Sequence, residues 1–171
     1  FLSFLPLNHV GERIGLELPA IWMGGMISFA ENLDTFAQNL QDTQPTMFFA
    51  VPRIWTKFYL GVLSKMPQEK LNRLLKIPVV SGMVKKKLRT ALGMRDIQIA
   101  ATGAAITPAF IKNFYKKLGI HLVEAYGMTE VCGSMTNSPD PNSPQDSVGK
   151  AVPFGEVALV LEGASALSRN T

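Results

Sequence analysis

The 171-residue sequence predicts an α/β fold in which βαβ units form a mainly parallel sheet flanked by helices. Short apolar runs, typical of buried strands, occur at residues 1–7, 26–30 and 45–51, and helical patterns separate them. A strand-like alternation at residues 96–102 is followed by a helical pattern and then by another apolar run at residues 120–126. Parallel strands require crossover connections, which are usually helices, so this order favours a parallel sheet.

The first half of the chain contains two predicted helices. Asn8 is expected to cap a helix that runs to about Met23, and Pro19 is expected to kink or divide it. Asp34 is expected to cap a second helix over residues 35–41. Together with the apolar runs, these helices give the strand–helix alternation on which the fold class depends.

The second half begins with a helix that Pro52 opens. Two more helices are predicted at residues 68–76 and 81–92. Thr107 followed by Pro108 reads as a cap before the next helix, which we expect to stop at Gly119.

The last part of the chain changes character twice. Residues 136–147 are polar and contain three prolines, which predicts a loop, and strand character resumes over residues 148–163. We therefore expect one partial domain over residues 1–163 and a tail at 164–171 that is disordered or foreign to the domain.

Composition, charge and missing motifs exclude several classes of function. The single cysteine, Cys132, excludes an internal disulfide. Residues 53–95 hold eleven Lys or Arg and one acid, whereas the rest of the chain holds six basic and twelve acidic residues. Patterns for dinucleotide-binding, P-loop, metalloprotease, serine hydrolase and thiol-redox sites do not occur.

A compact set of polar and aromatic residues, "YGMTE", follows the apolar run at 120–126. Tyr126 and Glu130 are at most about 13 Å apart in an extended chain, which is roughly the span from a purine base to its phosphates. Tyr126 suits stacking on a base, the Thr129 hydroxyl suits a phosphate, and Glu130 suits Mg²⁺ shared with phosphates. The structural alternative is an ordinary strand end at which Thr129 caps a helix.

A turn of small residues, Gly103, Ala104 and Ala105, follows the preceding predicted strand. Ligands of open parallel sheets bind beyond the carboxyl ends of the strands. If the two strands are neighbours, this turn and the Tyr126 segment face one crevice, where small residues let a flat ligand approach the backbone.

Four segments, whose order and spacing along the chain also agree, resemble the adenylate-forming (AMP-binding) superfamily, and in particular its long-chain fatty acid–CoA ligase branch; one of them is "TGAAITPAFIKNFYKKLGIHLVEAYGMTE". "FLPLNHVGER" is similar to a Pro-Leu-x-His-x-x-Glu-Arg segment, and "YGMTE" to the Tyr-Gly-x-Thr-Glu motif of the superfamily. "GGMISFAENLDTFAQNLQDTQPTMFFAVPRIWTKFY" and "SVGKAVPFGEV" resemble the corresponding stretches of the ligases. The resemblance covers residues 1 to about 160.

The resemblance implies two steps: attack of a fatty acid carboxylate on the α-phosphate of ATP, then displacement of AMP by the thiol of coenzyme A. It implies that Tyr126 and Gly127, with the turn of Gly103, Ala104 and Ala105, hold the nucleotide. Thr129 and Glu130 are the implied catalytic residues, because Thr129 would bind the α-phosphate and Glu130 would bind Mg²⁺. His9 falls at a position beside the acyl carboxylate.

The resemblance also implies a domain context. The phosphate loop of the family would precede Phe1 and its catalytic lysine would follow Thr171, so the chain is expected to be an internal part of the large domain, inactive alone. Alternatives are a fatty acyl-AMP ligase that uses a carrier protein, and a non-catalytic relative that binds nucleotide or acyl groups.

The basic segment allows a third function class. Lys85, Lys86, Lys87 and Arg89 are expected to form a solvated helix face, with peripheral contact to anionic lipid as the functional alternative. A basic module of this kind also suits nucleic acid, although no nucleic-acid partner is expected. Cytoplasmic localisation, with contact at the inner membrane face, follows as an expectation, and the oligomeric state is left open.

Overall fold

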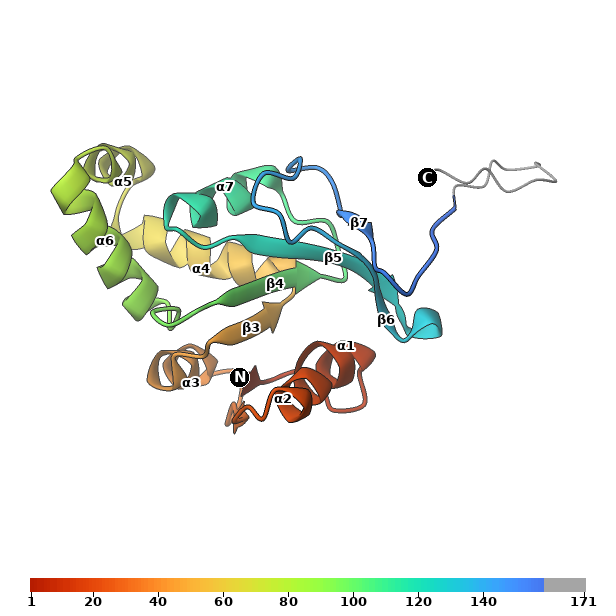
Figure 1. Cartoon of the computed structure of the whole chain (residues 1–171). Helices are drawn as coiled ribbons and strands as arrows, with labels where there is room; N and C mark the ends of the chain where they lie inside the picture. The colour runs from red at the N-terminus through yellow and green to blue at the C-terminus, as the bar shows by residue number, and fades with distance from the viewer. Residues whose placement is uncertain (159–171) are drawn as a thin grey trace.

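The computed structural model describes residues 1–158 and confirms the α/β fold, with a mainly parallel central sheet flanked by helices (Figure 1). The order of the five strands is β3-β4-β5-β6-β7. β3, β4 and β5 are parallel, whereas β6 and β7 are antiparallel to their neighbours. The strands are β3 (Met47–Ala50), β4 (Ile99–Gly103), β5 (Leu122–Met128), β6 (Gly133–Asn137) and β7 (Lys150–Ala151).

Four helices connect or extend the parallel strands, as the sequence predicts. α4 and α7 lie along one side of the sheet, and α5 and α6 extend past its end (Figure 1). α6 begins at Pro78, three residues earlier than predicted, because proline is well suited to the first turn of a helix. The helices are α4 (Pro52–Lys65), α5 (Gln68–Leu75), α6 (Pro78–Ala91) and α7 (Ala109–Lys117).

The N-terminal segments lie beyond β3 (Figure 1). The first two predicted strands do not join the central sheet but pair with each other in parallel. A helical segment between them contains a π-helical turn, η1, that ends two residues before Pro19. The elements are β1 (Leu2–Ser3), α1 (Val10–Glu12), η1 (Arg13–Glu17), α2 (Leu18–Trp22), β2 (Ser28–Phe29) and α3 (Phe36–Thr43).

Three predicted helix caps are wrong: a neighbouring side chain caps α1, and no side chain caps α3 or α7. His9, and not Asn8, caps α1: its Nδ1 accepts a hydrogen bond from the Gly11 amide at 3.0 Å. The Asn32 Oδ1 accepts from the amides of residues 34 and 35, so Asp34 does not cap α3, which begins after Thr35. Thr107 is buried and precedes the true cap position, Pro108.

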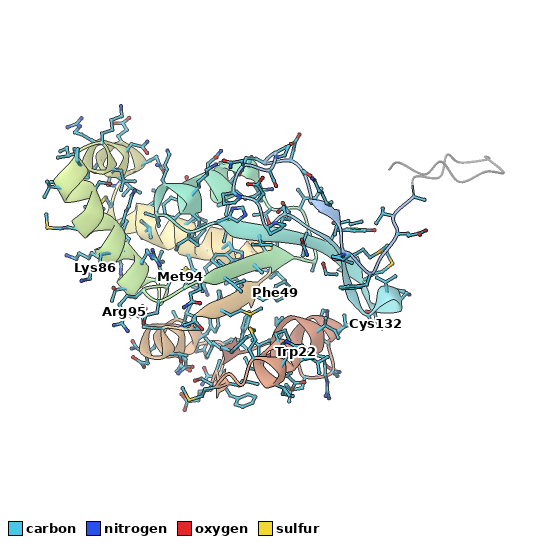
Figure 2. The ribbon with its side chains drawn as sticks, viewed as in Figure 1. Trp22, Phe49, Lys86, Met94, Arg95 and Cys132 are labelled. Carbon is cyan, nitrogen blue, oxygen red and sulfur yellow. The ribbon has the colours of Figure 1, made fainter. Side chains whose placement is uncertain are left out.

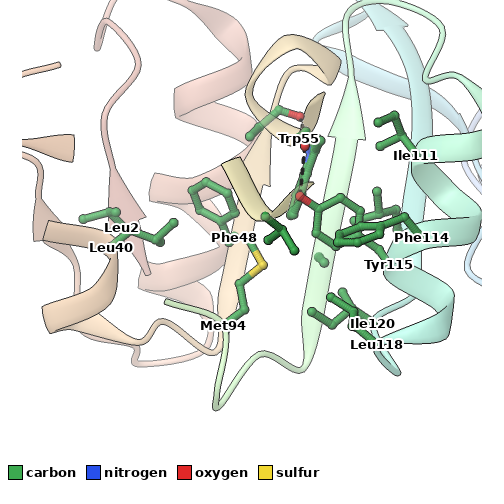
Figure 3. Close-up of a cluster of buried hydrophobic side chains, with 14 of the residues drawn as sticks. Leu2, Leu40, Phe48, Trp55, Met94, Ile111, Phe114, Tyr115, Leu118 and Ile120 are labelled. Atoms are coloured by element: carbon green, nitrogen blue, oxygen red, sulfur yellow. Dashed lines mark hydrogen bonds between the residues drawn. The ribbon is translucent and has the colours of Figure 1, made fainter. Parts of the chain in front are cut away.

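A buried aromatic cluster joins β3, α4 and α7 (Figure 3). The Trp55 ring packs edge-on against Phe48 and Tyr115, with ring centroids 5.3 and 5.0 Å away. The Trp55 Nε1 donates to the Ala50 carbonyl at 3.0 Å, and the Tyr115 hydroxyl donates to the Trp55 carbonyl at 2.9 Å. Burial raises the pKa of Tyr115, which keeps its hydroxyl a donor. The same core contains Ala100 of β4 and Leu122 of β5, so it also supports the strands that carry the candidate site.

The structure tests only part of the prediction for the end of the chain. Of the strand predicted over 148–163, the described residues form only the short β7, followed by a turn. Residues 159–171, which include the predicted tail, lie outside the described part of the chain.

Candidate functional site

The two turns predicted to face one crevice do lie side by side. β4 and β5 are parallel neighbours, and Gly103 pairs with Ala125. The turn after β4 therefore begins beside Tyr126, whose side chain is 46% exposed. A ring so exposed at the end of a central strand is available to stack on a ligand.

Within the turn, the three small residues have different roles. Gly103 is buried, and a Cβ there would lie 2.8 Å from the Ala125 carbonyl oxygen, so its missing side chain serves the packing of β4 against β5. Ala104 and Ala105 are exposed and form the accessible surface. Ala104 has a left-handed backbone with φ of 67°, an unfavourable conformation for alanine that is often found at ligand sites.

The residues of "YGMTE" form the start of a tight hairpin. The pairing of β5 with β6 is irregular between Tyr126 and Gly127, and a Cβ at Gly127 would overlap the Gly133 carbonyl oxygen. The tip is a short 3-10 turn, η2 (Thr129–Val131). Thr129 and Glu130 are exposed, and neither side chain makes a hydrogen bond within the described residues. Thr129 does not cap the turn, so the structural alternative for it is not supported.

His9 and Phe49 lie near the same end of the sheet. A Cβ at Gly11 would lie 3.0 Å from the His9 Nδ1 and 3.6 Å from the Phe49 ring, and a Cβ at Gly103 would lie 3.5 Å from that ring. The Phe49 ring therefore fills the space between the helix that carries His9 and the turn after β4, and Figure 2 shows it inside the fold. Phe49 was not among the predicted site residues, because its apolar run marks it only as a strand residue.

A buried carboxylate, that of Glu12, follows His9 in the same helix. Its side chain is 1% exposed, and its Oε1 has no hydrogen-bond partner among the described residues. Burial raises the pKa of Glu12, against smaller opposing effects of hydrogen bonds from the Ser3 side chain and the Leu5 backbone. The charged form is thus disfavoured in the folded chain.

Glu12 is expected to make stability depend on pH. Because its folded pKa is above the unfolded value, near 4.5, its contribution is fully present below that value and is lost as pH rises through the folded pKa. We expect Glu12→Gln to gain stability over wild type between pH 4 and pH 7, as measured by urea unfolding. The exposed Glu31→Gln is the control, and an equal gain in both variants would contradict the assignment.

The metal-ligating side chains near the site suit a metal ion that is also bound by phosphates. They do not suit a metal ion that is held by protein side chains alone. The described residues contain no group of three His, Cys, Asp or Glu side chains able to hold a metal ion. Glu130 offers one accessible carboxylate at the hairpin tip, and Mg²⁺ is commonly bound by one or two carboxylates together with substrate phosphates. The residues present therefore fit Mg²⁺ brought with a nucleotide.

Other candidate residues have structural roles. The His121 Nε2 lies 3.0 Å from the Ser138 carbonyl oxygen, as expected for a structural histidine. Arg89 does not belong to an outward basic face: its guanidinium donates to the carbonyls of Met94 and Arg95, at 3.2 and 3.1 Å. Lys86 and Lys87 are exposed on α6, whereas Lys85 is half-buried.

Comparisons with known proteins place this geometry in a family. The model of the family described as AMP-binding enzyme matches residues 1–168. The chain is 28% identical to long chain acyl-CoA synthetase 3 of Arabidopsis thaliana, over 93% of this chain and 27% of that protein. It is also 28% identical to the long-chain-fatty-acid–CoA ligase ACSBG1 of Bos taurus, over 97% of this chain and 27% of that protein. The chain thus spans about a quarter of these relatives.

Solved structures show the same fold. The A-PCP didomain of carboxylic acid reductase from Segniliparus rugosus, in complex with AMP, matches with a TM-score of 0.64 and 30% identity, over 80% of this chain and 19% of that chain. O-Succinylbenzoate CoA synthetase from Bacillus subtilis, in complex with its acyl-adenylate intermediate, matches with a TM-score of 0.66 and 16% identity, over 98% of this chain and 29% of that chain.

Proposed function

Because the chain belongs to the AMP-binding enzyme family, we propose that it forms part of a ligase that activates a long-chain fatty acid with ATP and transfers the acyl group to coenzyme A. One observation carries the proposal: the exposed Tyr126 ring lies beside the exposed Ala104–Ala105 turn, with Thr129 and Glu130 free at the hairpin tip just beyond it. The curated relatives named above, which are acyl-CoA ligases, support this choice of substrate and acceptor.

The proposed roles follow from the order of these residues. The adenine lies between Tyr126 and the Ala104–Ala105 surface, where stacking contributes about 1–3 kcal/mol. The Thr129 hydroxyl donates to the α-phosphate, and Glu130 binds Mg²⁺ together with the phosphates. When bound, Mg²⁺ neutralises charge that develops on the phosphates and the leaving pyrophosphate.

The acyl group approaches from the other side of the turn. His9 has its Nδ1 occupied by the Gly11 amide, so its Nε2 is the ring nitrogen left to face an acyl carboxylate. Phe49 lies between this helix and the turn, so its ring would border the start of the acyl site. Acyl chain length depends on residues deeper in that site.

The chain is proposed to be a middle part of the large domain, and a surface feature supports this. Trp22 is 91% exposed (Figure 2), and several other apolar side chains of residues 18–33 are exposed as well. Exposed apolar side chains gathered in one segment are typical of a surface that contacts other protein. These side chains are those of Leu18, Ile21, Met23, Met26, Phe29 and Leu33. The phosphate loop and catalytic lysine would then come from outside the chain, which alone would complete neither half-reaction.

Substitution of Tyr126 tests the proposed function. In the full-length protein that contains this chain, Tyr126→Ala is expected to weaken ATP binding roughly 5- to 100-fold, because stacking is lost, with little change in fatty acid affinity. Acid-dependent ATP–pyrophosphate exchange measures both affinities. Tyr126→Phe, which keeps the ring, is the matched control and should bind ATP nearly as wild type; equal ATP affinity in all three proteins would reject the nucleotide site.

The alternatives to the proposed function differ in the molecule that accepts the acyl group and in whether the protein catalyses adenylation at all. In the same assay, product release on addition of coenzyme A supports the acyl-CoA reaction. Exchange activity without transfer to coenzyme A would favour a fatty acyl-AMP ligase that uses a carrier protein. The match to the A-PCP didomain of a carboxylic acid reductase in complex with AMP is the reason for considering this alternative. Nucleotide binding without exchange would favour the non-catalytic relative.

A second proposal concerns α6, where apolar and basic side chains share one exposed face. Val79 and Met83 are exposed, and helical spacing places the exposed Lys86 and Lys87 on the same side of the helix; Figure 2 shows Lys86. Such a face suits peripheral contact with anionic lipid, which would bring the protein to the inner membrane face from the cytoplasm. In the described residues, no helix is long and apolar enough to cross a membrane.

Charge reversal tests the lipid contact. Each lysine near an anionic surface contributes about 1 kcal/mol, so Lys86→Glu/Lys87→Glu is expected to reduce binding to anionic liposomes by roughly tenfold or more. Sedimentation of the full-length protein with phosphatidylserine vesicles measures the partition. Lys57→Glu/Lys65→Glu, which changes two exposed lysines of α4, is the matched control. An equal reduction in both variants would show only a general charge effect.

A further inference from the structure

An open groove of about 650 Å³ lies between helices α3 and α6. Its walls include Gln41 and Asp42 from α3, and Met83, Lys86 and Lys87 from α6. Both lysines are exposed, and neither belongs to an ion pair within residues 1–158. The volume lies in the range that small-molecule sites occupy, so the groove has room for an anionic group and part of an apolar chain.

The width of the groove is fixed where the two helices end. The Gln44 side chain, directly after α3, donates to the Thr90 carbonyl of α6 at 2.9 Å and accepts from the Arg95 amide at 2.8 Å. Gly93, just after α6, packs so closely that a Cβ there would lie 2.5 Å from the Leu40 carbonyl oxygen of α3. The groove is thus formed before a ligand binds, which lowers the entropy cost of binding.

The groove and the candidate nucleotide site lie at opposite ends of the central sheet (Figure 1). Gln44 and Arg95 precede the first residues of β3 and β4, whereas Gly103 ends β4 beside the Tyr126 segment. The five residues of β4, at about 3.3 Å each, separate the two ends. A ligand in the groove is therefore distinct from the proposed nucleotide.

The donors of the groove suit a phosphate group. Lys86 and Lys87 carry ammonium groups, the Gln41 amide is a further donor, and lysine donates charge-assisted hydrogen bonds to phosphate oxygens. Residues 53–95 hold eleven Lys or Arg and one acid, so the field around α6 attracts anions. Asp42 is the only acid among the described residues that line the groove, and its charge opposes a bound anion.

Apolar side chains lie beside these donors. Met83 lines the groove, and Val79 lies one turn before it on α6; both are exposed. A phospholipid brings a phosphate and apolar chains together, so it can contact both kinds of side chain. Free phosphate would contact only the donors.

We propose that the α3–α6 groove binds the phosphomonoester headgroup of an anionic phospholipid, of the phosphatidic acid type, at a membrane surface. This inference rests on the lipid contact of α6 proposed above and adds a defined headgroup site to it. A phosphomonoester presents three terminal acceptor oxygens to the donors. The phosphate of phosphatidylserine is a diester, with its serine between the phosphate and the protein.

Vesicle composition tests the headgroup. Sedimentation of the full-length protein compares vesicles that contain phosphatidic acid with vesicles that contain phosphatidylserine, adjusted to the same surface potential. Binding to phosphatidic acid is expected to be at least about fivefold tighter, because charge-assisted hydrogen bonds add to the general attraction. Equal binding to both vesicles would show general charge attraction only.

Asp42→Asn tests the location of the headgroup. It removes a negative charge from the groove and keeps an oxygen acceptor for the Gln38 amide, which donates to the Asp42 Oδ1 at 2.8 Å. Binding to phosphatidic acid vesicles is expected to become about fivefold tighter, because a like charge near the phosphate is lost. Asp34→Asn makes the same charge change at an exposed residue outside the groove, and should change binding by less than about twofold.

Soluble ligands distinguish a lipid from free phosphate. Calorimetric titration of the full-length protein with a short-chain, monomeric phosphatidic acid should show one site per chain. Its affinity is expected to be at least about tenfold higher than that of inorganic phosphate, because Met83 and Val79 also cover its chains. Equal affinities would assign the groove to free phosphate and overturn the lipid assignment.

The outcomes separate this inference from the lipid contact of α6. Equal binding to both vesicles, with Asp42→Asn no different from Asp34→Asn, overturns the headgroup site and leaves the lipid contact intact. A wild-type protein that binds neither vesicle removes both. Tighter binding to phosphatidic acid, increased further by Asp42→Asn alone, supports the headgroup site. ATP–pyrophosphate exchange without vesicles should be unchanged in Asp42→Asn, because the groove lies away from the nucleotide site.

Discussion

Glu130→Ala is expected to reduce Mg²⁺-dependent adenylation by the full-length protein by at least about a hundredfold, the size of effect seen when one preorganised electrostatic contact to a transition state is removed. The reason is that Glu130 is the accessible carboxylate of the hairpin tip, and in the proposed site its removal would leave Mg²⁺ with the phosphates alone. ATP–pyrophosphate exchange over a range of Mg²⁺ concentrations measures the loss.

The location of Glu130 allows a clean control for this experiment. The side chain is exposed and has no hydrogen bond within residues 1–158, so Glu130→Ala should change the free energy of unfolding by no more than about 0.5 kcal/mol. Glu156→Ala removes another exposed carboxylate and should leave exchange unchanged. An exchange rate equal to wild type in Glu130→Ala would show that the metal-ligand assignment is wrong.

Trp55→Ala is expected to lower the free energy of unfolding by about 3–5 kcal/mol. Trp55 is fully buried, packs against Phe48 and Tyr115, and donates to the Ala50 carbonyl. Its removal leaves a cavity at the junction of β3, α4 and α7. A domain of this size is stable by about 5–15 kcal/mol, so the variant loses a large share of its stability and its melting temperature should fall by on the order of 10 °C.

The chain contains its own matched control for this prediction. Its other tryptophan, Trp22, is 91% exposed (Figure 2), so in the isolated 171-residue chain Trp22→Ala should change stability by no more than about 0.5 kcal/mol. Urea unfolding of both variants, followed by circular dichroism, gives the comparison. Equal losses of stability in the two variants would contradict the assignment of Trp55 to the core.

Local sequence patterns were sufficient for the order of the parallel strands and their helices and for the position of the motif, but not for β6, whose residues 136–137 were predicted as loop. Strand-like runs at 45–51, 96–102 and 120–126 correspond to β3, β4 and β5, and Pro52 and Gly119 mark helix ends as predicted. These features depend on backbone preferences and on period-2 or helical spacing, which a single chain segment carries by itself. The neighbouring strands also brought the small-residue turn beside Tyr126, as predicted.

Helix caps were predicted poorly, because several neighbouring residues can accept the same kind of hydrogen bond. Asn8 and Asp34 are good cap residues, yet His9 and Asn32 supply the observed acceptors. Several adjacent residues have similar cap preferences, and differences of a few tenths of a kcal/mol decide among them. Small tertiary contacts are therefore enough to shift a cap by one or two residues.

The sequence by itself determined the α/β order, the position of the "YGMTE" motif after a predicted strand, and the family; the tertiary structure showed that the motif begins a hairpin. The tertiary structure alone decided that Gly103 is buried under Phe49, that Glu124 pairs with Lys112, and that Glu12 lies buried without a full set of partners. The physical reason is that spacing along the chain records which local conformations are favoured. Burial and charge pairing depend on segments far apart in sequence, which meet only after the sheet has formed.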